Sequence, residues 1–340
     1  MNKDNALDIV VSGAGFIDPT HPATPGPGVA VILNNANGTF AAPQYFVPEQ
    51  EPGIVFGAAW GLAVADLDPA TQKGPDIIFM GLKGYGTPLD VFPCAVVLRR
   101  SSSGLTFDTE AYVPPGYVHP SQGEPVPYAI DVVASRFKQG DARDLDLAAT
   151  LFDGSLYVLR NNAGVLQNDA SAYQQALPKI KSPAIGAGLF RSGPLRDVVR
   201  TEWESDRGRA WVSESSASGT FTTLETPPLS DPPYKLWHPY GVATGRLNDD
   251  NNLDIVYACQ HGSISGSPGD DGGLVMIAGN GHTEPRFAWD APGQFSVRPP
   301  NEPTWIQPKP CFVQVADLDN DGWNDVAASC NVGSRLAVLL

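Results

Sequence analysis

The chain has 340 residues, a formal net charge of −15 and a charged-residue share of only 17%. This acidic balance disfavours a nucleic-acid partner, because phosphate backbones bind to basic faces, and no apolar run approaches the roughly 20 residues that insert into a membrane. The 35 Gly and 32 Pro indicate dense turns, whereas an apolar share of 42% is too high for a disordered chain.

One element recurs six times along the chain, an aspartate followed by a short apolar strand. A second apolar strand follows, and it ends in a polar turn such as residues 34–40 or 215–221, which is hairpin chemistry. Another strand precedes the aspartate and is the first of the repeat in chain order, as in residues 60–65, 240–245 and 311–316. Its small and β-branched residues suit strands crowded around a common axis. The six aspartates are Asp8, Asp76, Asp146, Asp197, Asp254 and Asp325.

The polar turn leads on to a fourth strand, so each repeat contains four short strands. This predicts an all-β fold, a β-propeller of four-stranded antiparallel blades with six recognisable repeats. A β-sandwich is the alternative, but its strands need not repeat one motif. The prediction is a single propeller over residues 1–340, with blades at approximately 1–55, 60–118, 128–178, 182–226, 238–291 and 309–340.

The two ends of the chain fall inside this repeat. The first blade starts just before its aspartate strand, and residues 335–340 read as a third strand with no fourth strand after them. We therefore expect a fragment of a longer propeller, for which a seven-bladed ring is one candidate. The opening Met1–Asn5 has no apolar segment behind it, so this chain shows no signal peptide.

The most specific motif lies in the last repeat, where residues 317–325 read Asp-Leu-Asp-Asn-Asp-Gly-Trp-Asn-Asp. Carboxylates stand at positions 1, 3, 5 and 9, and Gly322 stands at position 6, where a sharp turn is needed. Oxygen ligands at alternate positions of a tight loop suit a cation of calcium size, and closure at position 9 distinguishes the loop from an EF-hand. A solvated acidic turn is the alternative interpretation.

With this loop, the repeated aspartate strands and the turn at residues 34–40, the chain resembles the FG-GAP/VCBS repeat family. Its members are the propeller repeats of integrin α heads, certain fungal lectins and many secreted bacterial proteins. The resemblance implies an extracellular or cell-surface location and Ca²⁺ as a structural cofactor. It implies as ligands Asp317, Asp319, Asp321, the Trp323 carbonyl and Asp325.

The other loops depart from this pattern. The fifth repeat has Arg246 at position 1, whose guanidinium could replace a metal, and the loop of the second repeat is two residues longer. The third and fourth loops carry Arg136, Lys138 and Leu189 at positions that should be acidic. The weaker metal candidates are thus Asn248, Asp250 and Asp254 in the fifth repeat and Asp66, Asp68 and Asp76 in the second.

Aromatic residues gather in the long, proline-rich loops and connections at the end of the blades opposite the calcium loops. Such rings can stack on sugars or anchor a protein partner, and function concentrates on scaffold loops; packing of the rings onto the blades is the alternative. The predicted ligand-binding face contains Trp60, Tyr128, Trp237, His238, Tyr240, Trp289 and Trp305.

No catalytic motif is present, since HExxH, GxSxG and Walker patterns are all missing. The leading prediction is a non-enzymatic module that binds a glycan or a protein. A carbohydrate-active enzyme such as a propeller polysaccharide lyase, with His238 and Tyr240 in the chemistry, is one alternative. A structural repeat module of a larger surface protein is the other.

Two of the four cysteines are candidates for a disulfide bond. Cys311 and Cys330 lie on either side of the last loop, on strands expected to pair, and facing antiparallel positions suit a disulfide. Such a bond would imply an oxidising compartment, and free buried thiols are the alternative.

Overall fold

The structure, a computed structural model, describes the chain in segments, and every structural statement below concerns those segments. They are residues 8–16, 26–35, 37, 39–48, 54–71, 73–85, 90–101, 105–114, 129–138, 144–151, 154–167, 184–190, 195–202, 209–218, 221–225, 235–248, 252–263, 272–279, 293–295, 309–318, 321–330 and 335–339.

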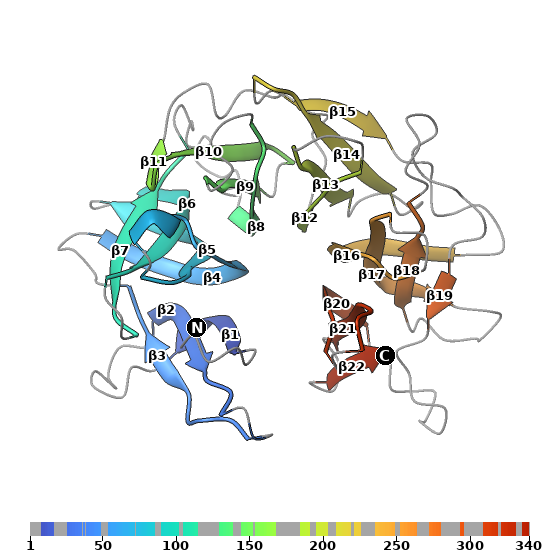
Figure 1. Cartoon of the computed structure of the whole chain (residues 1–340), viewed down its shortest axis with the longest axis horizontal. Helices are drawn as coiled ribbons and strands as arrows, with labels where there is room; N and C mark the ends of the chain where they lie inside the picture. The colour runs from blue at the N-terminus through green and yellow to red at the C-terminus, as the bar shows by residue number, and fades with distance from the viewer. Residues whose placement is uncertain are drawn as a thin grey trace. The chain divides into compact units, whose positions relative to one another are not determined.

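The predicted all-β fold is confirmed: the described residues form six antiparallel sheets of three or four strands and one 3-10 turn, η1 (Pro69–Thr71), as a propeller-like fold requires (Figure 1). Each sheet is a simple up-and-down meander, which is the form of a propeller blade. Contacts divide the chain into two compact units, residues 1–136 with 140–176, and residues 137–139 with 177–340. No helix among the described residues is long and apolar enough to cross a membrane.

The first unit contains three sheets. They consist of β1 (Ile9–Phe16), β2 (Gly26–Ile32) and β3 (Gln44–Phe46); β4 (Ile54–Ala65), β5 (Asp76–Tyr85), β6 (Asp90–Arg100) and β7 (Phe107–Tyr112); and β8 (Ala129–Ser135), β9 (Asp146–Leu151), β10 (Leu156–Asn162) and β11 (Val165–Gln167).

The second unit contains the other three. They consist of β12 (Ile185–Gly188), β13 (Asp197–Glu202), β14 (Arg209–Ser215) and β15 (Phe221–Glu225); β16 (Lys235–Gly245), β17 (Asp254–Ser263), β18 (Gly273–Ile277) and β19 (Gly293–Phe295); and β20 (Pro310–Ala316), β21 (Asp325–Cys330) and β22 (Arg335–Leu339).

The repeated aspartate sets the register of each sheet. In five blades it is the first residue of the second strand, and it pairs with the last residue of the first strand, as Ala65 pairs with Asp76 and Gly245 with Asp254. Alternation along the second strand then gives each blade two apolar faces. Two first strands, β4 and β16, begin earlier than predicted, because β-bulges let them keep pairing toward the far ends of β5 and β17.

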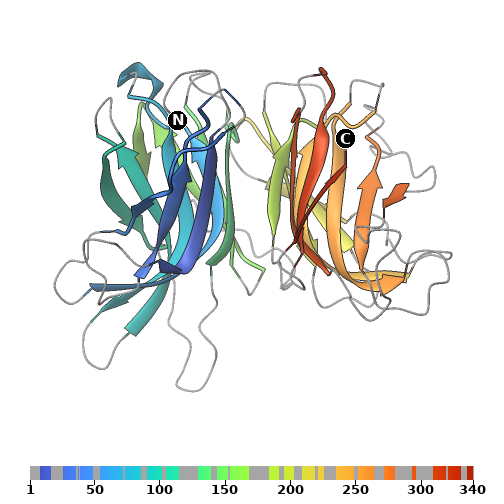
Figure 2. The same cartoon turned by 90° about the horizontal axis from the view of Figure 1, so that it is seen from below.

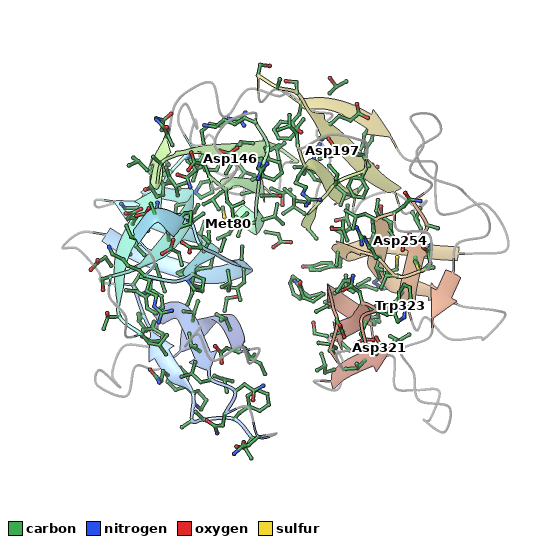
Figure 3. The ribbon with its side chains drawn as sticks, in the orientation of Figure 1. Met80, Asp146, Asp197, Asp254, Asp321 and Trp323 are labelled. Carbon is green, nitrogen blue, oxygen red and sulfur yellow. The ribbon has the colours of Figure 1, made fainter. Side chains whose placement is uncertain are left out.

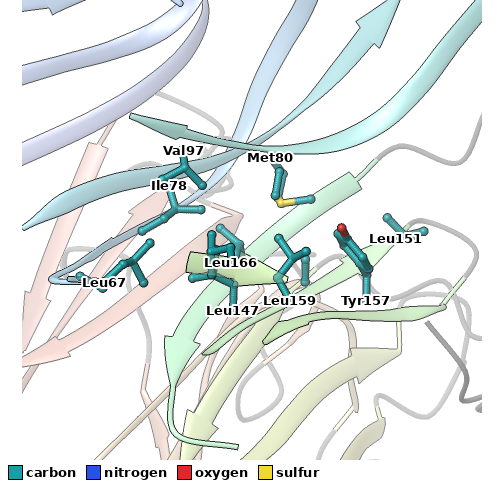
Figure 4. Packing of buried hydrophobic residues seen from close by; sticks show 13 residues of the cluster. Leu67, Ile78, Met80, Val97, Leu147, Leu151, Tyr157, Leu159 and Leu166 are labelled. Carbon is teal, nitrogen blue, oxygen red and sulfur yellow. The ribbon is translucent and has the colours of Figure 1, made fainter. Parts of the chain in front are cut away.

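Sheets within a unit stack face to face (Figures 1 and 2). In the first unit Ile78 and Met80 of β5 face Leu147 of β9 and Tyr157 and Leu159 of β10, and all five are at most 1% exposed (Figure 4). Burying each large apolar side chain stabilises the fold by about 1.5–3 kcal/mol. Equivalent clusters join β13 to β17 and β17 to β20 and β21 in the second unit.

Candidate functional site

The repeated aspartates accept hydrogen bonds from backbone groups at the loops of their own blades. Asp146, Asp197 and Asp254 are labelled in Figure 3. In five blades one carboxylate oxygen accepts a backbone N–H from the end of the third strand, and this bond closes the sheet at the side of the predicted calcium loops. The pairs are Asp8 with Asn34 (2.9 Å), Asp76 with Arg100 (2.8 Å), Asp146 with Asn161 (2.8 Å), Asp197 with Ser215 (3.0 Å) and Asp254 with Gly279 (3.0 Å).

In three blades a carboxylate oxygen of the aspartate, Oδ2, accepts the N–H of the leucine at position 2 of the loop. The bonds are 3.1 Å for Asp76, 2.8 Å for Asp254 and 2.7 Å for Asp325. Sequence reasoning treated these aspartates as markers of the repeat and as metal ligands, and it missed this role. The sequence signal for this structural role was the presence of the aspartate in the third and fourth repeats, whose basic or apolar loops do not suit a metal.

A guanidinium enters the loop of the second blade. Arg99 donates to Asp76 (3.4 Å), to Glu110 (3.1 Å) and to the Gly164 carbonyl of the next blade (2.8 Å). Burial lowers the pKa of Arg99, but the charges of Glu110 and Asp76 outweigh it and raise that pKa overall. Burial raises the pKa of Asp76, whereas its N–H donors and Arg99 act in the opposite direction. A protein cation thus lies beside a carboxylate predicted as a weaker metal ligand.

The rest of that loop, with the candidates Asp66 and Asp68, is bent by a short turn. The Asp68 carbonyl accepts the Thr71 N–H (3.1 Å), and the Leu67 carbonyl accepts the Asn161 side-chain amide of the neighbouring blade (2.7 Å). In the fifth blade, Asn248 turns its amide N–H toward Asp254 (3.3 Å), and Arg246 is exposed. Asp250 lies outside the described residues.

The last loop turns at Gly322, whose φ is 96°. The Gly322 N–H donates to Oδ2 of Asp317 (3.0 Å), and the Trp323 N–H donates to Asp321 (2.8 Å). Oδ1 of Asp317 is buried and has no hydrogen-bond partner among the described residues. Asp319 lies outside the described residues, and within them no group of three His, Cys, Asp or Glu side chains is arranged to hold a metal. Asp321 and Trp323 are labelled in Figure 3.

A second cluster lies at the other end of the β16–β17 pair. His238 and His261 form an edge-to-face ring pair with centroids 5.0 Å apart. The register places Trp237 opposite His261, and a bulge at Tyr240 re-aims the residues around it. Sequence reasoning named His238 but not His261, because a lone histidine on an adjacent strand carries no pattern of its own.

The neighbouring blade contributes to this cluster through β20. Tyr240 meets Phe312 edge to face at 6.1 Å, and Nε2 of Gln260 donates to Sγ of Cys311 (2.9 Å). Burial, with a smaller contribution from the Cys311 charge, raises the pKa of Tyr240. This end of β16, β17 and β20 therefore carries two ring pairs, His238 with His261 and Tyr240 with Phe312, together with the amide of Gln260.

No disulfide joins Cys311 to Cys330, and all four cysteines are buried thiols. The physical reason is a bulge in β20. Pro310, not Cys311, pairs with Cys330, and Phe312 pairs with Ser329, so that Cys311 is left out of the ladder.

The other predicted face residues cannot be assigned a position in the site. The backbones of Trp60 and Trp237 lie in β4 and β16, but their side chains are outside the described part of the structure. Tyr128, Trp289 and Trp305 lie wholly outside it. Of the seven predicted residues, the structure places only the side chains of His238 and Tyr240, and it brings both into the second cluster.

No protein-family model and no protein of curated function matches the sequence. Among solved structures, a protein from Lactobacillus plantarum is similar with a TM-score of 0.53 and 12% identity, over 98% of this chain and 78% of that one. The BP39L lectin from Burkholderia pseudomallei is similar with a TM-score of 0.44 and 14% identity, over 97% and 94%. At such identity the first likeness shows the fold alone, and the second carries no statement about function.

Proposed function

We propose that the chain is a non-enzymatic glycan-binding module of the FG-GAP/VCBS propeller type, in which Ca²⁺ secures the last loop. The observation that carries the binding proposal is the cluster of Tyr240, Phe312, His238 and His261. Aromatic faces stack on sugar rings, and flanking polar groups fix orientation, which is the usual composition of a ligand site.

The same cluster supports binding rather than catalysis. A general base works best when its pKa lies near the operating pH. Burial shifts the pKa of Tyr240 upward, away from neutrality. The Tyr240 phenol therefore keeps its proton at neutral pH and can donate a hydrogen bond to a bound ligand.

An exposed ring allows a clean test of glycan binding. Phe312 is 44% exposed, so Phe312→Ala should leave the fold intact while it removes a stacking surface. We expect binding on a glycan array to fall by about 10-fold. The guide is the stacking of an aromatic side chain on a nucleobase, which is worth about 1–3 kcal/mol per ring. Phe40→Ala is the matched control, because Phe40 is 51% exposed and lies in the first unit. If Phe312→Ala binds glycans as tightly as Phe40→Ala, or if a bound glycan is turned over, the proposal is contradicted.

The calcium part of the proposal concerns the last loop alone. Asp317 has a buried oxygen without a partner, Asp321 and Trp323 flank the turn, and Asp325 is buried. Such oxygens suit a hard cation, and with Asp319 they would hold it. The bound ion would offset the repulsion among the carboxylates and would restrain the loop. The second blade is left out of the proposal because Arg99 already lies beside Asp76.

Terbium luminescence tests this part directly, because an indole can pass excitation energy to a nearby lanthanide. Trp323 belongs to the loop and is 51% exposed. We expect tryptophan-sensitised emission that Ca²⁺ competes away, that Trp323→Phe reduces and that Asp317→Asn abolishes. Asp108→Asn, at an exposed site on β7, is the control. Emission unchanged by Asp317→Asn would exclude calcium at this loop.

A further inference from the structure

The connection between β2 and β3 carries a modification motif. Asn37-Gly38-Thr39 is the only tripeptide in the sequence of the form Asn-x-Ser/Thr in which x is not proline. This pattern is the acceptor sequence for N-linked glycosylation, and it occurs in surface loops of secreted proteins. The tripeptide shares no residue with the last loop or with the second cluster, so its chemistry is separate from both.

The tripeptide lies in an exposed turn. Asn34 forms an isolated bridge with Phe40, and between them the Asn35 N–H donates to the Thr39 carbonyl (2.9 Å). Asn35, Asn37, Thr39 and Phe40 are all exposed. Exposed loop tips accept bulky additions without disturbing a core. A sugar chain on Asn37 therefore does not have to displace a buried side chain.

The two residues that define the acceptor sequence contact each other directly. Oδ1 of Asn37 accepts the Thr39 N–H (3.0 Å) and the Thr39 hydroxyl (2.6 Å). A backbone N–H can only donate, so the atom facing Thr39 is the amide oxygen. Nδ2, the nitrogen to which a glycan is joined, has no hydrogen-bond partner among the described residues. Nδ2 can therefore be substituted without the loss of these bonds.

The turn itself does not require an asparagine at position 37. Residues 34–40 read Asn-Asn-Ala-Asn-Gly-Thr-Phe, and residues 215–221 of the fourth repeat read Ser-Ser-Ala-Ser-Gly-Thr-Phe. Ser218 stands at the place of Asn37, and its hydroxyl is 2.7 Å from that of Ser216 in an exposed turn. The shared Gly-Thr-Phe belongs to the turn, whereas the asparagine distinguishes the first repeat.

We propose that Asn37 carries an N-linked glycan, a modification that goes beyond the function proposed above and does not rest on it. The donor is an oligosaccharide joined through a pyrophosphate to a lipid. Nδ2 bonds to C1 of the first sugar, and the bond between C1 and the pyrophosphate oxygen breaks. The lipid pyrophosphate leaves with the bonding electrons, and the amide nitrogen loses one proton to a base of the transferase. The modification fits the extracellular or cell-surface location that the family resemblance implies.

The test is the mass of the full chain after secretion from a eukaryotic cell behind an added signal peptide. The mass is measured before and after treatment with an amidase that removes N-linked glycans and converts the modified asparagine to aspartate. Peptide mapping then locates the site. We expect most of the secreted chains to lose a sugar mass on treatment, and the conversion to occur at Asn37 alone.

The variants separate the acceptor sequence from the turn. Asn37→Gln and Thr39→Ala should each abolish the loss of mass, and Thr39→Ser, which keeps the hydroxyl, should retain it. Asn35→Gln is the matched control, because it removes an asparagine of the same turn that is outside the acceptor sequence, and it should change nothing. Ser218→Asn brings the acceptor sequence into the equivalent turn of the fourth repeat and should add a second glycan.

The mapping of the wild-type chain decides the question even if a variant is not secreted. A secreted wild-type chain without sugar at Asn37 overturns the inference, whether or not Ser218→Asn gains a glycan. A loss of mass that persists in Asn37→Gln or in Thr39→Ala overturns it as well, because the sugar would then be attached elsewhere or by another chemistry. Neither result affects the proposed function, which the glycan array and terbium luminescence test at other residues.

Discussion

Two loops of this chain begin with the same four residues, Ala-Asp-Leu-Asp, at positions 65–68 and 316–319. In both, the leucine N–H donates to the aspartate that begins the next strand, at 3.1 Å and 2.7 Å. Yet Leu67 is fully buried, whereas Leu318 is 42% exposed. The same four residues therefore form the same backbone hydrogen bond in both loops. The neighbouring sheet determines how far the leucine is buried and how much it contributes to stability.

The neighbours of the two loops differ in charge as well. The second-blade loop receives Arg99 from its own sheet and Asn161 from the next one. No described sheet of the second unit covers the corresponding side of the last loop, where Oδ1 of Asp317 is buried without a hydrogen-bond partner. The first loop is thus stabilised by protein groups, and the other is the one for which we propose Ca²⁺.

Removal of the aspartate from the second-blade loop should have the largest effect. Asp76→Ala takes the acceptor from the N–H groups of Leu67 and Arg100 and a charge partner from Arg99. Unsatisfied buried donors cost about 1–3 kcal/mol each, so we expect the free energy of unfolding in urea to fall by about 4 kcal/mol. A loss below about 1 kcal/mol would mean that water replaces the carboxylate, and the bonds would then not stabilise the blade.

The position-2 leucines provide the next test. Leu67→Ala should destabilise the chain by about 3 kcal/mol, because it empties a buried site between two sheets. Leu318→Ala, at the same position of the same tetrapeptide, should cost less than about 1 kcal/mol, since the side chain is already largely in water. Equal losses would show that the outer side of the last blade is covered in solution.

Much of this fold could be predicted from the sequence, because the repeated aspartate marks the same register position in five of the six described sheets. Contacts between side chains of different strands could not. Arg99 is 23 residues from Asp76, and His261 reaches His238 only through strand pairing. The Cys311–Cys330 pairing failed because one bulge displaces Cys311, and a shift of one residue changes which face a side chain occupies.

Replacement of Arg99 should have an intermediate effect on the stability of the chain. Arg99→Met keeps the apolar stem but leaves Asp76 and Glu110 without their shared partner, and the Arg99 and Asp76 side chains are only 13% and 6% exposed. Breaking a buried pair costs about 3–5 kcal/mol; Glu110 is 40% exposed, so we expect about 2 kcal/mol in urea unfolding. Arg246→Met, at an exposed arginine, is the control and should change stability by less than about 0.5 kcal/mol.

The smallest effects concern two glycines that border these loops. Gly164 and Gly322 have φ of 88° and 96°, so alanine is strained at either site. The left-handed backbone alone costs about 1–2 kcal/mol. A Cβ at Gly322 would meet no atom within 4 Å, whereas at Gly164 it would lie 2.8 Å from Cγ of Asp68. We therefore expect thermal unfolding to show a larger loss for Gly164→Ala than for Gly322→Ala. If Ca²⁺ restrains the last loop, a chelator should enlarge the loss of stability caused by Gly322→Ala and leave the loss caused by Gly164→Ala unchanged. If the chelator changes neither loss, the effect of Gly322→Ala comes from backbone strain and not from a metal.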